Sequence, residues 1–129
     1  MKYPEDLKYT GSDEWVRVED GVATIGISDF AQDQLSDIVY LEYVVSAGDT
    51  VAKGDTLGTI ESVKAASDIS LPVGGEVLET NEGLLDAPET VNTDPYGEAW
   101  MVKVKLADES ELDGMMDAAA YSKSAEERS

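Results

Sequence analysis

Residues 54–81, GDTLGTIESVKAASDISLPVGGEVLETN, decide the fold of this chain. TLGTIES mixes Thr, Ile and Leu and predicts a strand. SDISLP predicts a second strand, which meets Pro72 and the turn at Gly74 and Gly75. The pattern therefore predicts a β-hairpin over about residues 56–73, with Lys64 at or near its tip.

Lys64 is isolated from other basic residues. No Lys or Arg lies between Lys53 and Lys64, or between Lys64 and Lys103. A lysine at the tip of an arbitrary hairpin is usually a solubilising surface residue. Here, however, a single ammonium group lies on a tight turn among acidic residues. Another protein could recognise such an isolated positive charge.

The residues around Lys64 also carry a family resemblance. GTIESVKAASDISLPVGGEV closely resembles the lipoyl-lysine segment of the glycine cleavage system H proteins, in which the lysine of ESVKA carries a lipoyl group in amide linkage. Biotin carriers usually place their lysine between methionines, and 2-oxoacid dehydrogenase lipoyl domains usually have Asp directly before it. Here Val63 precedes Lys64, and Glu61 lies three residues before it, where the resemblance implies a role in recognition by the lipoylating enzyme.

The resemblance extends over nearly the whole chain. LKYTGSDEWV resembles the opening of the family, VATIGISDFAQDQLSDIVYLE a central block, and VNTDPYGEAWMVKVK the closing strand. Biotinyl domains and short lipoyl domains lack these flanks. Two departures stand out, because the family usually has His at the position of Asp13 and Gly at the position of Ser36.

The resemblance implies a fold. We expect one mainly β domain over residues 1–129, a flattened sandwich or barrel of the lipoyl/biotinyl carrier type (a barrel-sandwich hybrid). Short helices would lie near the N-terminal third and at the C-terminus, the latter over about residues 108–127.

The resemblance also implies a function as a non-catalytic carrier, with lipoic acid attached to Lys64. The arm would take an aminomethyl group from glycine decarboxylase (P protein) to the aminomethyltransferase (T protein). Dihydrolipoamide dehydrogenase (L protein) would then reoxidise it, and a lipoate ligase or transferase would install it. The family suggests that Ser12, Glu14 and Asp68 line a cleft that shields the loaded arm, although Ser12 and Glu14 could equally be a solvated strand end and Asp68 a charged turn flank.

Composition narrows the classes of function. The 129 residues include 28 acidic and nine basic side chains, for a formal charge of −19, and neither cysteine nor histidine. The usual general base and metal ligand are therefore missing, which fits chemistry supplied by an attached group. We expect no nucleic acid or membrane partner, because phosphates need a basic face. We also expect a monomer in a bacterial or archaeal cytoplasm, or alternatively in an organellar matrix.

The remaining pattern predicts the other elements. We expect an extended arm over 1–13, a hairpin of strands 14–19 and 22–27 turning at Asp20 and Gly21, and a helix over 29–35 capped by Ser28. A strand over 37–45, apolar on both faces except at Glu42, should be central in its sheet. Further predictions are a helical turn over 81–87 capped by Asn81 and a strand over 98–106. We also expect a helix over 108–121, either weakened at Gly114 or broken there into two short helices, and a frayed tail over 122–129.

Other functions remain open at this point. An H-like protein could act mainly as a relay of lipoyl groups to other lipoyl domains. A biotin carrier is disfavoured by the missing methionine flanks, and a stand-alone enzyme by the lack of catalytic side chains.

Overall fold

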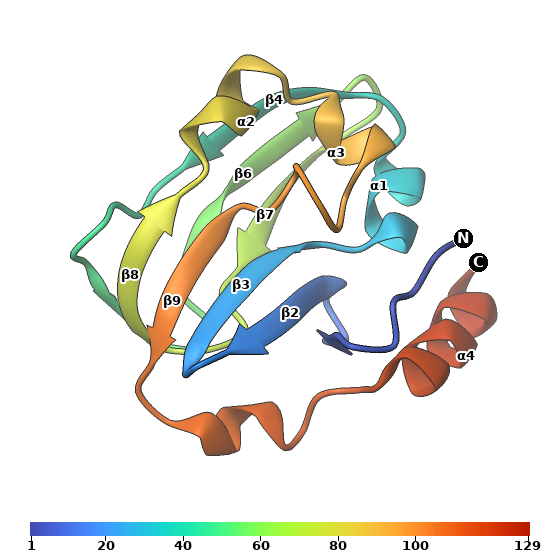
Figure 1. Ribbon diagram of the computed structural model, residues 1–129. Helices are drawn as coiled ribbons and strands as arrows, with labels where there is room; N and C mark the ends of the chain where they lie inside the picture. The colour runs from blue at the N-terminus through green and yellow to red at the C-terminus, as the bar shows by residue number, and fades with distance from the viewer.

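The computed structural model describes residues 1–129 as two β-sheets with short helices at their ends (Figure 1). The strands are β1 (Lys8–Tyr9), β2 (Glu14–Glu19), β3 (Val22–Ile27), β4 (Ile38–Tyr43), β5 (Thr50–Val51), β6 (Thr56–Ser62), β7 (Ala66–Ser70), β8 (Gly75–Thr80) and β9 (Val102–Leu106). The helices are α1 (Asp29–Leu35), α2 (Glu82–Asp86), α3 (Thr90–Thr93) and α4 (Ala118–Arg128), with a 3₁₀ turn, η1 (Glu109–Leu112).

The larger sheet has six strands in the order β1-β2-β3-β9-β8-β5. Its β2–β3 hairpin is the predicted one: Glu19 pairs with Val22 across a two-residue turn. Asp20 and Gly21 have φ of 51° and 76°, the left-handed conformation that Asp-Gly supplies in such turns.

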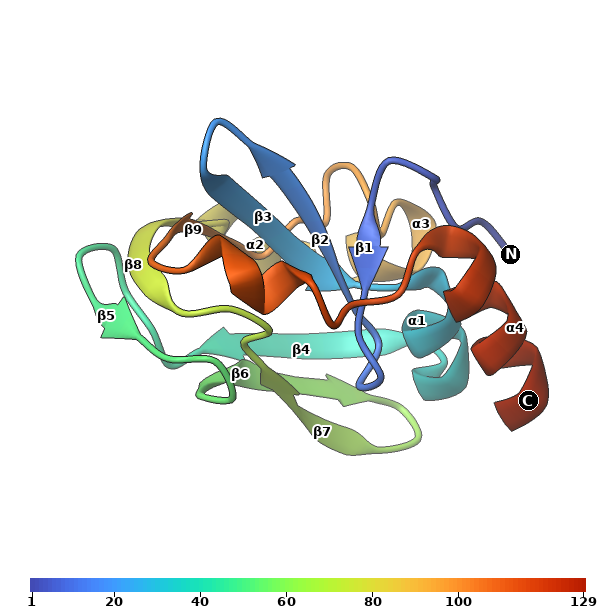
Figure 2. The ribbon, with the colours of Figure 1, turned by 90° about the horizontal axis from the view of Figure 1, so that it is seen from below.

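The smaller sheet has three strands in the order β4-β6-β7 and lies below the larger sheet in Figure 2. The main core of 18 buried residues fills the space between the two sheets. Ile25 and Val104 of the larger sheet and Leu41 and Ile60 of the smaller one belong to it. This two-layer β architecture confirms the predicted fold class.

The prediction that the strand over 37–45 is central was wrong. β4 is an edge strand of the small sheet, and β6 lies in the middle. An apolar run does not reveal which faces of a strand are covered. Here Ile38 and Leu41 enter the core, whereas Val39 and Tyr40 are 54% and 47% exposed.

The predicted helix over 108–121 is broken around Gly114 into two short segments, which was one of the two expectations, but the prediction of a frayed tail over 122–129 was wrong. The chain forms η1, then an extended segment, then α4, which continues to Arg128. Asp117 caps α4 by accepting a hydrogen bond from the Ala120 amide at 2.8 Å. Tyr121 and Ala125, at 0% and 3% exposure, anchor this helix in a second core, which stabilises the segment expected to fray.

The second core gathers aromatic side chains from distant segments. Its buried members are Leu7, Tyr9, Trp15, Phe30, Ala118, Tyr121 and Ala125. The Tyr9 and Tyr121 rings stack with centroids 4.7 Å apart. The indole N–H of Trp15 donates to the Pro95 carbonyl at 2.9 Å. The predicted N-terminal arm is thus pinned to the body of the molecule by β1.

Two local predictions were only partly correct. The last strand begins at Val102 rather than at residue 98, because the amides of Glu98 and Trp100 bond within a preceding turn. Trp100 is therefore half-buried beside the second core, with the Lys103 ammonium 4.8 Å from its ring centroid. Helix α2 follows Asn81 as predicted, but the Asn81 side chain does not cap it and donates to the Trp100 carbonyl at 2.7 Å.

Candidate functional site

Lys64 lies in the turn that joins β6 to β7. The Ser62 hydroxyl shapes this turn, because it accepts hydrogen bonds from the amides of Lys64 and Ala65 at 3.1 and 3.0 Å. The Lys64 side chain is exposed, and its ammonium contacts only the Gln34 carbonyl, at 3.5 Å. The structure therefore presents this side chain from a fixed turn, next to the end of α1.

Glu61 and Val63 flank the lysine on the surface. Glu61 lies between Tyr40 and Ala66 in the small sheet, and its side chain is exposed. Val63 is 69% exposed, although its amide donates to the Asp37 carbonyl at 3.0 Å. Glu61 and Val63 thus lie within three residues of Lys64 in the sequence, and both side chains are accessible to an approaching protein.

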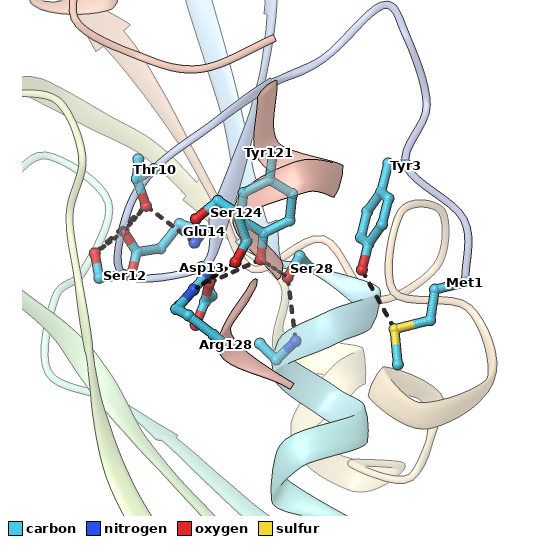
Figure 3. A network of polar contacts seen from close by, with 11 residues as sticks. Met1, Tyr3, Thr10, Ser12, Asp13, Glu14, Ser28, Tyr121, Ser124 and Arg128 are labelled. Atoms are coloured by element: carbon cyan, nitrogen blue, oxygen red, sulfur yellow. Dashed lines mark hydrogen bonds and ion pairs between the residues drawn. The ribbon is translucent and has the colours of Figure 1, made fainter. Parts of the chain in front are cut away.

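Glu14 is buried at the start of β2, with only 3% of its surface exposed. Its Oε1 accepts hydrogen bonds from the hydroxyls of Thr10 at 2.7 Å and Ser12 at 2.8 Å (Figure 3). Burial raises the pKa of the Glu14 carboxyl, the two hydroxyl donors partly oppose that rise, and neighbouring Asp13 adds to it. Glu14 is not a solvated strand end, which was one of the two readings of the sequence.

A cleft of about 190 Å³ connects these residues to the surroundings of Lys64. Ser12 and Glu14 line it together with Gln34, whose carbonyl contacts Lys64. Apolar side chains line the cleft between them: Ile27, Ala31, Leu35, Ile60 and Ile69. The lysine thus stands close to a cleft lined by both apolar and polar residues, among them the acidic residues Asp13, Glu14 and Asp68.

Asp68 borders the same cleft, but its carboxylate is engaged elsewhere. Strand pairing places Asp68 opposite Thr59, whose hydroxyl donates to its Oδ1 at 3.2 Å. Ser67 pairs with buried Ile60 and therefore shares the core-facing side. The structure brings Ser12, Glu14 and Asp68 to one cleft, with Asp68 at its rim.

A second hollow, of about 400 Å³, is also lined by Ser12 and Glu14. It is bordered by Lys53, Leu71 and Pro72 of the smaller sheet's loops and by Met115 and Met116. Ser12 and Glu14 thus border both hollows.

Some residues of the site carried no readable signal in the sequence. Gln34 and Leu35 looked like ordinary positions of a short amphipathic helix, and Arg128 looked like part of a charged tail. No group of three or more acidic residues is arranged to hold a metal ion. None of the helices has the length and apolar character needed to cross a membrane.

Comparisons with known proteins agree over almost the full length. A family model described as glycine cleavage H-protein matches residues 7–128. A glycine cleavage system H protein from Marinobacter nauticus is 61% identical over 92% of this chain and 91% of its own. One from Bacteroides thetaiotaomicron is 51% identical over 94% and 95%. The crystal structure of an H protein from Mycobacterium marinum superposes with a TM-score of 0.85 at 31% identity, covering 94% of this chain and 97% of that one.

Proposed function

This chain belongs to the glycine cleavage H-protein family, whose members are lipoyl carriers, and from that premise we propose that Lys64 is its lipoyl attachment site. The observation that carries the proposal is the Lys64 turn itself. The ESVKA motif lies at an exposed hairpin tip, with the amine free of any carboxylate partner and beside the mouth of a cleft.

The residues present fit a lipoyl group. An exposed amine on a rigid turn can form an amide without disturbing the core, and the apolar side chains of the cleft suit a hydrocarbon arm. When attached, the lipoyl group supplies a disulfide that is reduced as it accepts the aminomethyl group. This chain has no cysteine or histidine, so no protein side chain competes for that chemistry.

The chain's own residues would shelter and orient the loaded arm. Oε1 of Glu14 is held by Thr10 and Ser12, which leaves Oε2 without a hydrogen bond and able to accept one from a protonated amine. A cation there would favour the charged carboxylate and offset the effect of burial. The apolar side chains of the cleft would reduce the access of water to a group that is prone to hydrolysis.

The proposed role of the lipoylated chain is to carry an aminomethyl group from glycine decarboxylase to the aminomethyltransferase. Dihydrolipoamide dehydrogenase then reoxidises the lipoyl group. The family membership and the free lysine support this role. The excess of acidic side chains, 28 against nine basic ones, favours encounters with basic surfaces on these enzymes. A cytoplasmic location is part of the same proposal and is supported by the bacterial relatives.

Intact mass and peptide mapping of protein from cells with active lipoate synthesis test the attachment. We expect one lipoyl group, on Lys64, none in Lys64→Arg, and normal modification in the control Lys105→Arg, which changes another exposed lysine. Unmodified Lys64, or a lipoyl group on another lysine, would overturn the assignment.

The four-component glycine cleavage reaction tests the shuttle. Lys64→Arg should keep its fold but lose all carrier activity, because arginine cannot form the amide. A lipoylated wild-type chain that donates lipoate to other lipoyl domains but does not support glycine decarboxylation would instead indicate the relay function.

A further inference from the structure

Asp13 lies between the two cleft residues Ser12 and Glu14 and has an unusual backbone. Its φ of 75° is in the left-handed region, which Asp tolerates better than most residues but does not prefer. The conformation of the Ser12–Glu14 segment therefore depends on what holds Asp13 in place.

The Asp13 carboxylate is held by the end of the chain (Figure 3). Arg128 donates through Nη2 to Oδ1 at 2.7 Å and through Nη1 to Oδ2 at 3.3 Å, and the Tyr121 hydroxyl donates to Oδ1 at 2.8 Å. The guanidinium also lies 4.9 Å from the Phe30 ring centroid. The only other ion pair in the molecule is a single contact of 3.9 Å between Lys103 and Glu79.

The same network reaches the opposite wall of the cleft. The proton of Tyr121 goes to Asp13, so Ser28 must donate to the Tyr121 oxygen in their 2.6 Å contact. The Ser28 oxygen in turn accepts from the Ala31 amide at the start of α1, and its amide donates to the Asp13 carbonyl at 2.9 Å. Helix α1 supplies Ala31, Gln34 and Leu35 to the cleft.

We propose that α4 is a clamp in which Arg128 and Tyr121, acting through Asp13 and Ser28, fix the Ser12–Glu14 segment against α1. Arg128 and Tyr121 are thus positioning residues for the cleft that they do not themselves line. The functional meaning of the clamp rests on the proposed role of that cleft in sheltering the arm.

Amide hydrogen exchange on the full-length, unmodified chain tests the clamp. The amides of Thr10, Asp13 and Ser28 report on it, because each bonds within the segment or to Asp13. In Arg128→Gln we expect these amides to exchange roughly tenfold faster, with β3 and β9 unchanged. Lys123→Gln removes an equal charge from an exposed position of the same helix and should leave all of them unchanged.

A second variant and a second measurement separate positioning from general stability. Tyr121→Phe keeps the ring stacking but loses the hydroxyl, and should accelerate the Asp13 and Ser28 amides to a smaller extent. A pH titration of the Glu14 carboxyl carbon by NMR should show the raised pKa returning toward its ordinary value in Arg128→Gln, as the segment opens to water.

Two results would overturn the clamp: unchanged exchange in Arg128→Gln, or a uniform increase that includes β3. Neither result depends on lipoylation, since the protein is unmodified throughout. Failure of the clamp would leave the mass assignment of Lys64 untouched, and failure of that assignment would leave the exchange pattern untouched.

Discussion

Ser36, which follows α1, adopts a backbone conformation that suits glycine. Its φ of 68° and ψ of −152° lie in a region that is almost exclusive to glycine and costs a side-chain residue about 1–3 kcal/mol. We expect Ser36→Gly to raise the free energy of unfolding by about 1 kcal/mol, measured by urea denaturation. Ser36→Ala keeps the Cβ and should give no gain, and an equal gain in both variants would contradict backbone strain as the cause.

Glu14 should make stability depend on pH in an unusual direction. Because burial raises its pKa above the ordinary 4.5, the folded protein binds a proton that the unfolded chain has already released. The contribution of Glu14 therefore favours folding at low pH and is lost as the pH rises through the folded pKa.

Glu14→Gln should accordingly be more stable than the wild type at pH 7, with the difference closing as the pH falls through the raised folded pKa toward 4.5. Denaturation at several pH values measures this, with exposed Glu126→Gln as the control. A difference that is constant over pH would show that packing, rather than ionisation, sets the effect.

At the scale of elements, Gly58 controls the pairing of the strand that carries the lysine turn. A Cβ at this position would lie 2.1 Å from the Glu42 carbonyl oxygen, a backbone atom that cannot move without breaking the β4–β6 ladder. We expect Gly58→Ala to cost about 3 kcal/mol in unfolding free energy by chemical denaturation. Gly114→Ala, where the Cβ meets nothing within 4 Å, should be nearly neutral, and similar losses in both would refute the steric argument.

Elements with local signals were predictable from the sequence, and those set by distant contacts were not. The lysine hairpin, the Asp20–Gly21 turn and the Ser28 cap all follow from neighbouring residues. The order of strands in the small sheet depends on which segments cover β4. The stability of α4 depends on the stacking of Tyr121 on Tyr9, which lies 112 positions earlier in the sequence.

The same division holds for the candidate site. The motif around Lys64 predicts an attachment residue, and the resemblance predicts roles for Ser12, Glu14 and Asp68, which line one cleft in the structure. No local pattern links Asp13 to Arg128, which lie 115 positions apart in the sequence. The orientation of Asp68 toward Thr59 also needed the strand register.

At the scale of the whole molecule, charge repulsion opposes folding. A formal charge of −19 is balanced by only two ion pairs. Raising NaCl from about 0.01 to 0.5 M shortens the screening length from about 30 Å to a few ångströms. We expect the melting temperature to rise by about 4 °C, which corresponds to about 1 kcal/mol for a domain of this size.

Scanning calorimetry across the salt series measures this shift. KCl should give the same rise, because screening depends on ionic strength rather than on the cation. A falling melting temperature, or a response to one cation alone, would contradict repulsion as the cause.

The buried indole of Trp15 has a further consequence. It follows Glu14 directly in the chain and is sealed from water, whereas Trp100 is half-exposed beneath the Lys103 ammonium. The two tryptophans should therefore emit at different wavelengths, the buried one toward the blue. With Trp100 replaced by Phe, the remaining emission would come from a single fluorophore in the second core, so the protein carries an intrinsic optical reporter of that core that needs no added dye.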